Sequence, residues 1–265
     1  MADPETKNPI EKIAAEAEHP APAVKAAVAP KPVRTRRAWI FQVYVVGAVL
    51  AFGTLAFFAS QTNYWPADLA ITLAVQSIRF APFDWIMRFL TVIGFAPQVL
   101  LFWSLSILFL YITGLKWEAL VALFAVGEAS VLGGVVKLLV NRPRPDAPGV
   151  TIIDKLADTS FPSGHVLFYV AFVGFLWFLT YTLLKPSWRR TLLLWGFGAV
   201  VALGGLSRIY MGEHWPSDVL GSYLIGSVCL GLSIELYRWG KPRFFVTQPL
   251  APSQPAGVQP SAVGR

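Results

Sequence analysis

The chain has 265 residues, a length that suits one domain or two small ones. Hydrophobic residues make up 55% of it and charged residues only 14%, against about 25% charged residues in an ordinary soluble domain. This composition excludes an ordinary soluble protein and indicates a membrane protein. The net charge of +7 would suggest nucleic-acid binding in a soluble chain, but here the basic residues flank apolar runs, as topological signals do. We therefore expect no nucleic-acid partner.

Both ends of the chain have the composition of disordered tails. Residues 1–37 alternate Ala, Pro, Lys and Glu, and residues 241–265 are rich in Pro, Gln and Ala. Such segments cannot bury enough apolar surface to offset the entropy lost on ordering. The first tail also lacks the early apolar core of a signal peptide. The sequence therefore predicts one membrane domain, residues 38–240, between two tails.

Six apolar runs within this domain have about the length that a helix needs to cross a bilayer, roughly 17–25 residues. They are Trp39–Ser60, Phe95–Thr113, Trp117–Val140, Val166–Leu184, the shorter Thr191–Leu206, and Val219–Leu236. The predicted fold class is all-α, a polytopic membrane helix bundle with about six transmembrane helices.

Residues 61–94, between the first two runs, are apolar but interrupted by Asp68, Arg79, Asp84 and Arg88. This pattern favours an amphipathic helical segment that lies at the membrane interface. The alternative is a seventh, poor span over residues 67–90, which would invert the topology of everything that follows.

Charge predicts the orientation of the six spans. With the N-terminal tail in the cytoplasm, the inner connections hold Lys116, Lys185, Arg189 and Arg190, and the last span is followed by further basic residues. Positive charge on the cytoplasmic side is the usual bias. We therefore expect both termini in the cytoplasm and three segments on the outer face, residues 61–94, 141–165 and 207–218.

Two of these outer segments, together with the end of the third span, contain three stretches with chemical potential. The first joins Lys137 to Arg144-Pro145, the second is Phe161-Pro162-Ser163-Gly164-His165, and the third runs from Ser207-Arg208 to His214 and Asp218. Each has an ordinary explanation by itself: a snorkelling lysine, a helix start, a polar loop. All three, however, lie at span ends on one predicted face. Together they supply cations for a phosphate and two histidines for attack and protonation.

The pattern Lys-x6-Arg-Pro, Pro-Ser-Gly-His, Ser-Arg-x5-His-x3-Asp resembles the type 2 phosphatidic acid phosphatase superfamily, shared with vanadium haloperoxidases and glucose-6-phosphatase. The three signatures are complete, and the resemblance extends from about Phe83 to Arg238. It implies a helical membrane bundle with an outward-facing site and without a metal or other cofactor.

The resemblance also implies roles. His214 would be the nucleophile that forms a phosphohistidine, Asp218 would orient it, and His165 would protonate the leaving group. The phosphate would be held by Lys137, Arg144, Ser163, Gly164 and Arg208.

Other ionisable residues receive structural interpretations. Glu128 lies inside the third span and out of phase with Lys137, which favours a hydrogen bond within the bundle over catalysis. Asp146, Asp154 and Asp158 have irregular spacing beside Gly and Pro, which favours a solvated loop over a cation site. Glu213 could tune the pKa of His214, but a solvated side chain is the more common case.

The leading hypothesis is an integral membrane phosphatase that acts on a lipid phosphate or diphosphate, of polyprenyl diphosphate, phosphatidate or phosphatidylglycerophosphate type. The resemblance places it in a bacterial inner membrane with a periplasmic site. No obligate protein partner is evident. The alternatives are a lipid phosphotransferase, a vanadate-dependent haloperoxidase, and a membrane protein that binds lipid without catalysis. The last does not explain the two histidines, because binding needs no general acid.

Overall fold

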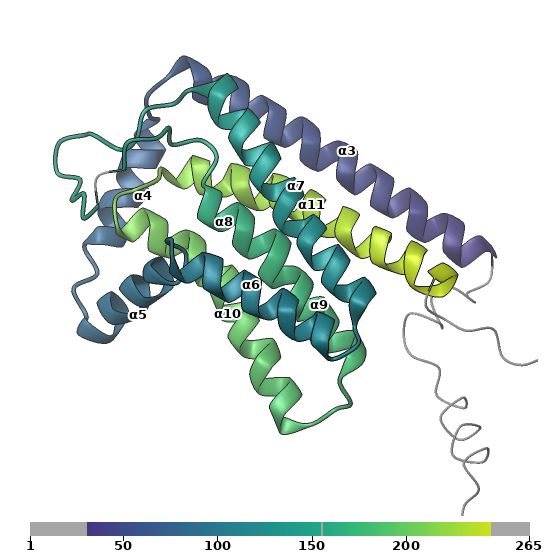
Figure 1. Ribbon diagram of the computed structural model, residues 1–265. Coiled ribbons are helices and arrows are strands. Elements are labelled where there is room, and N and C mark those ends of the chain that lie inside the picture. Colours follow the sequence, from purple (N-terminus) through teal and green to yellow (C-terminus); the bar gives the residue numbers. More distant parts are fainter. Residues whose placement is uncertain (1–30, 155, 245–265) are drawn as a thin grey trace, which may run out of the picture.

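The computed structural model describes residues 31–154 and 156–244, and every regular element in this part of the chain is a helix (Figure 1). The helices are α3 (Lys31–Gln61), α4 (Pro66–Gln76), α5 (Ala81–Val92), α6 (Gln98–Ile112), α7 (Lys116–Val140), α8 (Gly164–Phe168), the π-helical turn η1 (Tyr169–Val173), α9 (Gly174–Leu183), α10 (Trp188–Tyr210) and α11 (Pro216–Phe244). The predicted all-α class is confirmed.

Five helices among the described residues are long and apolar enough to cross a membrane. They are Thr35–Gln61, Lys116–Val140, the continuous helix Gly164–Leu183, Trp188–Tyr210 and Pro216–Lys241. The protein is therefore an integral membrane protein with a helical bundle.

The remaining predicted span is shorter than expected. Helix α6 has 15 residues, because it starts after Pro97 and is followed by Gly114, whose positive φ of 84° ends the helix. Its length is about 22 Å, less than the hydrocarbon core of about 30 Å. It nevertheless runs antiparallel to α7 and connects the two ends of the bundle (Figure 1). The chain thus passes along the bundle six times, with five membrane-length helices and this short one.

The segment between the first two passes forms two helices. Residues 77–80 separate α4 from α5, and a proline in the first turn of α5 starts the second helix anew. Neither helix exceeds 12 residues, which excludes a seventh span over residues 67–90. Helix α5 exposes Trp85 and Phe89 and buries Met87, and its position at the membrane interface stays a prediction. Helix α4 differs, since it buries Asp68 and Thr72 against the bundle.

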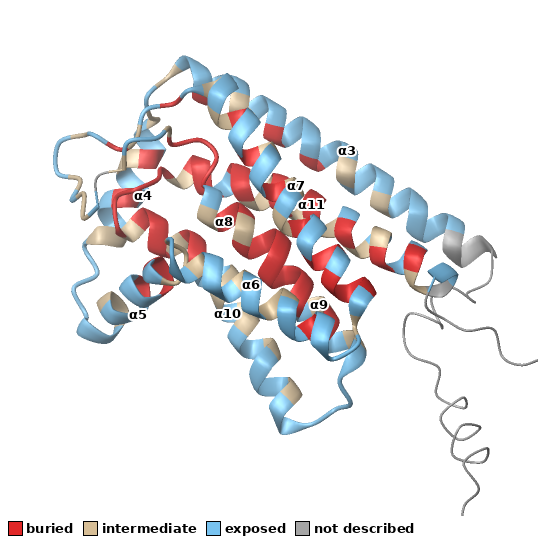
Figure 2. Cartoon of the chain, viewed as in Figure 1, coloured by how far each residue is buried: buried red, intermediate tan, exposed pale blue. Residues whose placement is uncertain are grey.

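Apolar side chains fill the interior of the bundle and also cover its outer faces, as expected of a protein in lipid. The continuous helix Gly164–Leu183 is central, and its Phe172 and Phe175 lie in the main apolar core. The outer faces of α3, α6 and α10 expose large apolar side chains (Figure 2), including Trp195 at 76% exposure. In a membrane these faces contact acyl chains rather than water. Inside the bundle, the Ser233 hydroxyl donates a 2.6 Å hydrogen bond to Glu128, which confirms the structural interpretation of that carboxylate.

The membrane domain reaches slightly beyond its predicted limits. Helix α3 already begins at Lys31, inside the segment predicted to be a tail, and α11 continues to Phe244. Residues 1–30 and 245–265, which contain the rest of the predicted tails, lie outside the described part of the chain. The start of α3 and the end of α11 lie at the end of the bundle away from the connection between α7 and α8 (Figure 1).

Candidate active site

Four helix ends meet at one end of the bundle. Helices α7 and α10 end there, α8 and α11 begin there, and α4 packs against α10 and α11 beside them. Because successive helices run in opposite directions, this arrangement brings the three sequence motifs together. The residues predicted as catalytic or phosphate-binding all lie in this region, at helix ends or in the two connections.

Lys137 and Arg144 converge on one carboxylate. Lys137 Nζ donates to Asp158 Oδ2 at 2.5 Å, and Arg144 Nη2 donates to Asp158 Oδ1. Asp158 is an exposed loop residue, as predicted, but its carboxylate is paired with two cations. The sequence does not show the pairing, because Asp158 is 21 residues from Lys137 and meets it only in the fold.

The contacts of His214 assign its tautomer. Arg144 Nη1 lies 3.2 Å from His214 Nε2. A guanidinium can only donate, so Nε2 carries the lone pair and the proton is on Nδ1. Burial lowers the pKa of His214 well below its ordinary value of 6.5, and the charges of Arg144, Arg208 and Lys137 lower it further. His214 is thus a neutral imidazole whose Nε2 lone pair faces the cations.

Asp218 is anchored, but not by His214. Its Oδ2 is 3.7 Å from His214 Nδ1, beyond a hydrogen bond, so the predicted orienting bond is not formed in this structure. The carboxylate instead accepts from Arg142 Nη1 at 2.5 Å, from the Trp215 amide at 2.8 Å and from the Ser160 hydroxyl. Asp218 therefore occupies a fixed position beside the Nδ1 face of the ring.

Arg142 is the centre of this network, and the sequence analysis gave it no role. It is fully buried and pairs with both Asp218 and Asp68, the latter at 2.8 Å. It also donates to the Ser217 hydroxyl at 2.7 Å and lies over the Trp65 ring. Asp68 in turn accepts from the Ser217 amide at 2.9 Å. These contacts join α4 to the start of α11 and so dock α4 against the bundle.

The second motif forms the start of the central helix, as predicted. Ser163 is the N-cap residue of α8, and His165 lies in the first turn. The Ser163 amide is already used, because it donates to Ser222 Oγ at 2.8 Å. By contrast, Ser163 Oγ and His165 Nε2 are buried without a hydrogen-bond partner among the described residues. Buried polar atoms are normally paired, so unpaired ones at a helix start indicate a place for a polar ligand.

Arg208 is buried and pairs with Glu213, so the interpretation of Glu213 as solvated is wrong. Its guanidinium also lies 4.9 Å from the centre of the Phe95 ring. The Phe95 ring also packs edge to face with the His165 ring, with 4.8 Å between the ring centres. Phe95, in the connection between α5 and α6, therefore links the cation of the third motif to the histidine of the second.

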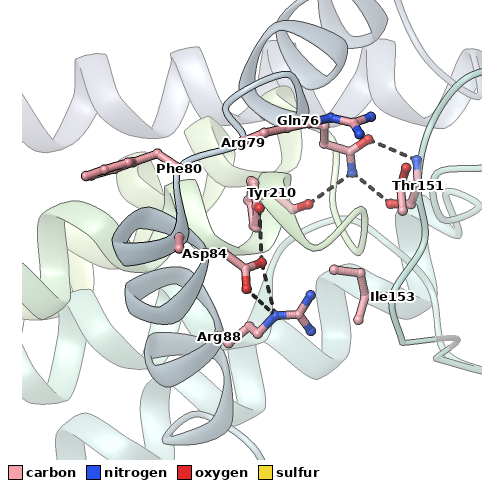
Figure 3. A pocket seen from close by; sticks show the side chains of 9 residues that line it. Gln76, Arg79, Phe80, Asp84, Arg88, Thr151, Ile153 and Tyr210 are labelled. Atoms are coloured by element: carbon pink, nitrogen blue, oxygen red, sulfur yellow. Dashed lines mark hydrogen bonds and ion pairs between the residues drawn. The ribbon is translucent and has the colours of Figure 1, made fainter.

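Two cavities flank the connection between α7 and α8. The larger has about 490 Å³ and is lined by Gln76, Arg79, Asp84, Arg88 and Tyr210 among others (Figure 3). The smaller has about 250 Å³ and is lined by Arg144, Asp154 and Glu213 among others. Neither is lined by a histidine, since His214 is buried beneath the connection. The smaller cavity, which contains Arg144, borders the motif residues.

Gln76, which lines the larger cavity, bonds to the connection between α7 and α8 and to the end of α10. Its side-chain amide donates to the carbonyls of Thr151 and Tyr210 at 2.7 and 3.0 Å, and it accepts from the Thr151 amide at 2.9 Å (Figure 3). These bonds fix the connection against the end of α10.

Among the described residues, no three His, Cys, Asp or Glu side chains group closely enough to hold a metal ion. The expectation of chemistry without a metal stays a prediction.

Comparisons with known proteins agree with the motifs. The model of the PAP2 superfamily matches residues 118–241. The chain is 35% identical over 116 residues to the undecaprenyl-diphosphatase of Sulfolobus acidocaldarius, covering 42% of this chain and 52% of that protein. It is 30% identical over 162 residues to phosphatidylglycerophosphatase B of Bacillus subtilis, covering 60% of this chain and 78% of that protein. The chain thus spans about half the length of the first relative.

The fold has a counterpart among solved structures. A transmembrane PAP2-type phosphatidylglycerolphosphate phosphatase from Bacillus subtilis aligns with a TM-score of 0.61 at 24% identity, covering 76% of this chain and 98% of that one. At this identity the likeness shows the fold alone.

The fold defines a helical membrane protein, and the family match groups it with membrane phosphatases. The chain belongs to the PAP2 superfamily, as the resemblance of its three motifs indicates.

Proposed function

We propose that this protein removes a phosphate from a lipid phosphate or diphosphate through a phosphohistidine on His214. The observation that carries the proposal is the contact of His214 Nε2 with Arg144, which leaves the lone pair directed towards the cations predicted to hold a phosphate. Burial and the surrounding positive charge keep this imidazole neutral, because they lower the pKa of His214. A neutral imidazole is the nucleophilic form.

The reaction has two balanced steps. In the first, His214 Nε2 forms a bond to phosphorus while the bond from phosphorus to the lipid oxygen breaks, and His165 gives a proton to that oxygen. In the second, His165 takes a proton from water, the water oxygen bonds to phosphorus, and the bond to His214 breaks with release of phosphate. Arg144, Lys137 and Arg208 stabilise the charge on the phosphoryl oxygens in both steps. Ser163 Oγ and the Gly164 amide donate to the same oxygens.

The site suits a substrate whose tail stays in the bilayer. The motif residues lie at the ends of membrane spans, so a head group reaches them while its chains remain among the exposed apolar faces. The names of two relatives, an undecaprenyl-diphosphatase and a phosphatidylglycerophosphatase, support polyprenyl diphosphate and phosphatidylglycerophosphate as substrate types. Phosphatidate belongs in the same panel.

We also propose a bacterial inner membrane with the site on the periplasmic side. Lys116, the stretch from Lys185 to Arg190 and the basic residues at the end of α11 all lie at the bundle end away from the site. Positive charge marks the cytoplasmic side, so the site faces outward and both chain termini lie in the cytoplasm.

The test is phosphate release from the three lipid types in detergent micelles by the parent protein, His214→Ala and His19→Ala. His19 lies outside the three motifs, so its replacement controls for the loss of a histidine. We expect one or more lipids to release phosphate with the parent and His19→Ala and none with His214→Ala. A denatured phosphoprotein that is labile to acid and stable to base should appear with the parent and with His19→Ala, but not with His214→Ala. Release that persists in His214→Ala would refute the assignment of the nucleophile.

A further inference from the structure

The Asp158 carboxylate is paired with two of the three cations that are assigned to the substrate phosphate, Lys137 and Arg144. One oxygen accepts from Lys137 Nζ at 2.5 Å and the other accepts from Arg144 Nη2. Lys137 Nζ and Arg144 Nη2 cannot donate to the Asp158 carboxylate and to a bound phosphate at the same time. Binding of a phosphate therefore includes an exchange of one anion for another.

The cations keep their positions without this carboxylate. Lys137 Nζ also donates to the Thr159 carbonyl at 2.6 Å. Arg144 donates to the backbone carbonyls of Asp158 and Glu213 at 3.0 and 2.7 Å. These main-chain bonds do not depend on the side chain at position 158. The carboxylate is thus a removable anion on a site that the backbone has already built.

Asp158 is also placed to leave. Its side chain is 56% exposed, while those of Lys137 and Arg144 are 18% and 13% exposed beneath it. It stands in a stretch without helix between α7 and α8. Burial raises the pKa of Asp158, but Lys137 and Arg144 outweigh this and hold the pKa at about 2. The group is therefore ionised at neutral pH.

We propose that Asp158 is a specificity-determining residue, an internal anion that selects terminal phosphates over phosphodiesters because only the former displace it from Lys137 and Arg144. A phosphomonoester carries about −1.5 to −2 charge near neutral pH and offers three strong acceptor oxygens. A phosphodiester carries a single charge. The exchange therefore favours the terminal phosphate, in a membrane where a site of free cations would also attract diester head groups. The inference rests on the proposed function, since it assigns the substrate class of the same site.

The chain offers a matched control. Asp146 lies in the same connection and is exposed, and it makes no ion pair or hydrogen bond within the described residues. Asp146→Asn removes the same charge as Asp158→Asn without releasing either cation. A general effect of net charge would appear in both variants.

The experiment measures binding of inorganic phosphate and of dimethyl phosphate, a soluble diester, to the purified full chain by isothermal titration at pH 8. In Asp158→Asn we expect phosphate to bind about three- to tenfold more tightly, the range for removing two partly exposed ion pairs. Dimethyl phosphate should bind measurably only to this variant. Asp146→Asn should behave as the parent does.

Phosphate binding that is unchanged or weaker in Asp158→Asn would overturn the proposal and make Asp158 an orienting residue. Parent protein that binds the diester as tightly as phosphate, or that binds neither anion, would overturn it without any variant. Should Asp158→Asn fail to fold, Asp158→Ala takes its place. Because the readout is binding, the expected pattern without phosphate release from any lipid would refute the proposed function alone.

Discussion

Arg144 Nη1 lies 3.2 Å from Nε2 of His214, and the same guanidinium nitrogen donates to the carbonyl of Glu213 at 2.7 Å. One arginine therefore fixes both the residue before the histidine and the nitrogen that carries the lone pair. Since a cation at this distance opposes protonation of the ring, Arg144 controls when His214 is nucleophilic.

This relationship predicts the acid limb of activity. Burial, Arg144 and Arg208 lower the pKa of His214 below 6.5, so the neutral form persists as pH falls through that value and is lost only at lower pH. The acid limb of kcat/KM should lie below pH 6.5. In Arg144→Gln it should move to higher pH, because one of the depressing charges is gone. The substrate titrates identically in both proteins, so the difference between the two profiles reports the enzyme. An acid limb that is unchanged in Arg144→Gln would show that Arg144 does not lower the pKa of His214.

The same shift has a consequence for stability. His214 is neutral when folded and titrates near its ordinary value when unfolded, so protonation favours the unfolded state. Thermal stability should fall as pH decreases below 6.5, and His214→Gln should show a smaller fall over the same window. Differential scanning fluorimetry from pH 7.5 to pH 5 measures both. Equal pH dependence of the two proteins would contradict the assignment of a depressed pKa.

His165 is predicted to act on the leaving group. His165→Ala should lose about 10²- to 10⁴-fold in kcat on an alkyl lipid phosphate, the usual contribution of a general acid. The loss should be much smaller on p-nitrophenyl phosphate, whose leaving group needs no proton. His214→Ala should be inactive on both. An equal loss of His165→Ala on the two substrates would indicate that His165 binds phosphate instead.

Breaking the buried pair between Arg142 and the two aspartates should destabilise the fold. Arg142→Gln leaves Asp68 and Asp218 buried without their partner, and such a change typically costs about 3–5 kcal/mol. A lower unfolding temperature in detergent, with loss of activity, is the expected result. Arg238→Gln removes an exposed pair with Glu235 and should change the stability by about 1 kcal/mol or less. If Arg142→Gln is as stable as the parent, the network of Arg142, Asp68 and Asp218 does not contribute to the stability of the fold.

Gly94 has room for no side chain. A Cβ there would overlap Cδ2 of His165 and the hydroxyl of Tyr169, which itself is held by a 2.7 Å hydrogen bond to the Leu90 carbonyl. Gly94→Ala should therefore displace His165 and lower kcat on alkyl substrates more than on aryl ones. Gly127→Ala, in the middle of α7 with no atom near the added methyl group, should leave kcat unchanged. A kcat of Gly94→Ala equal to that of the parent would show that the connection between α5 and α6 shifts to accommodate the methyl group without displacing His165.

Much of this protein follows from its sequence. Long apolar runs in lipid have to form helices, because no water is present to satisfy their backbone groups. Alternate ends of successive spans lie on the same side of the membrane, so the order of the runs suffices to place Lys137, His165 and His214 at one end of the bundle. The motifs then identify the family without any coordinates.

The tertiary structure decided which charges pair. Arg142 reaches Asp68 across 74 residues and Asp218 across 76, and Arg144 reaches Asp158 across 14. The sequence contains no periodicity that links such positions, and Asp158 has the same local signature as an unpaired loop residue. The burial of Glu213 and the docking of α4 have the same origin. They depend on which surfaces meet when the helices pack, and only the assembled bundle determines that.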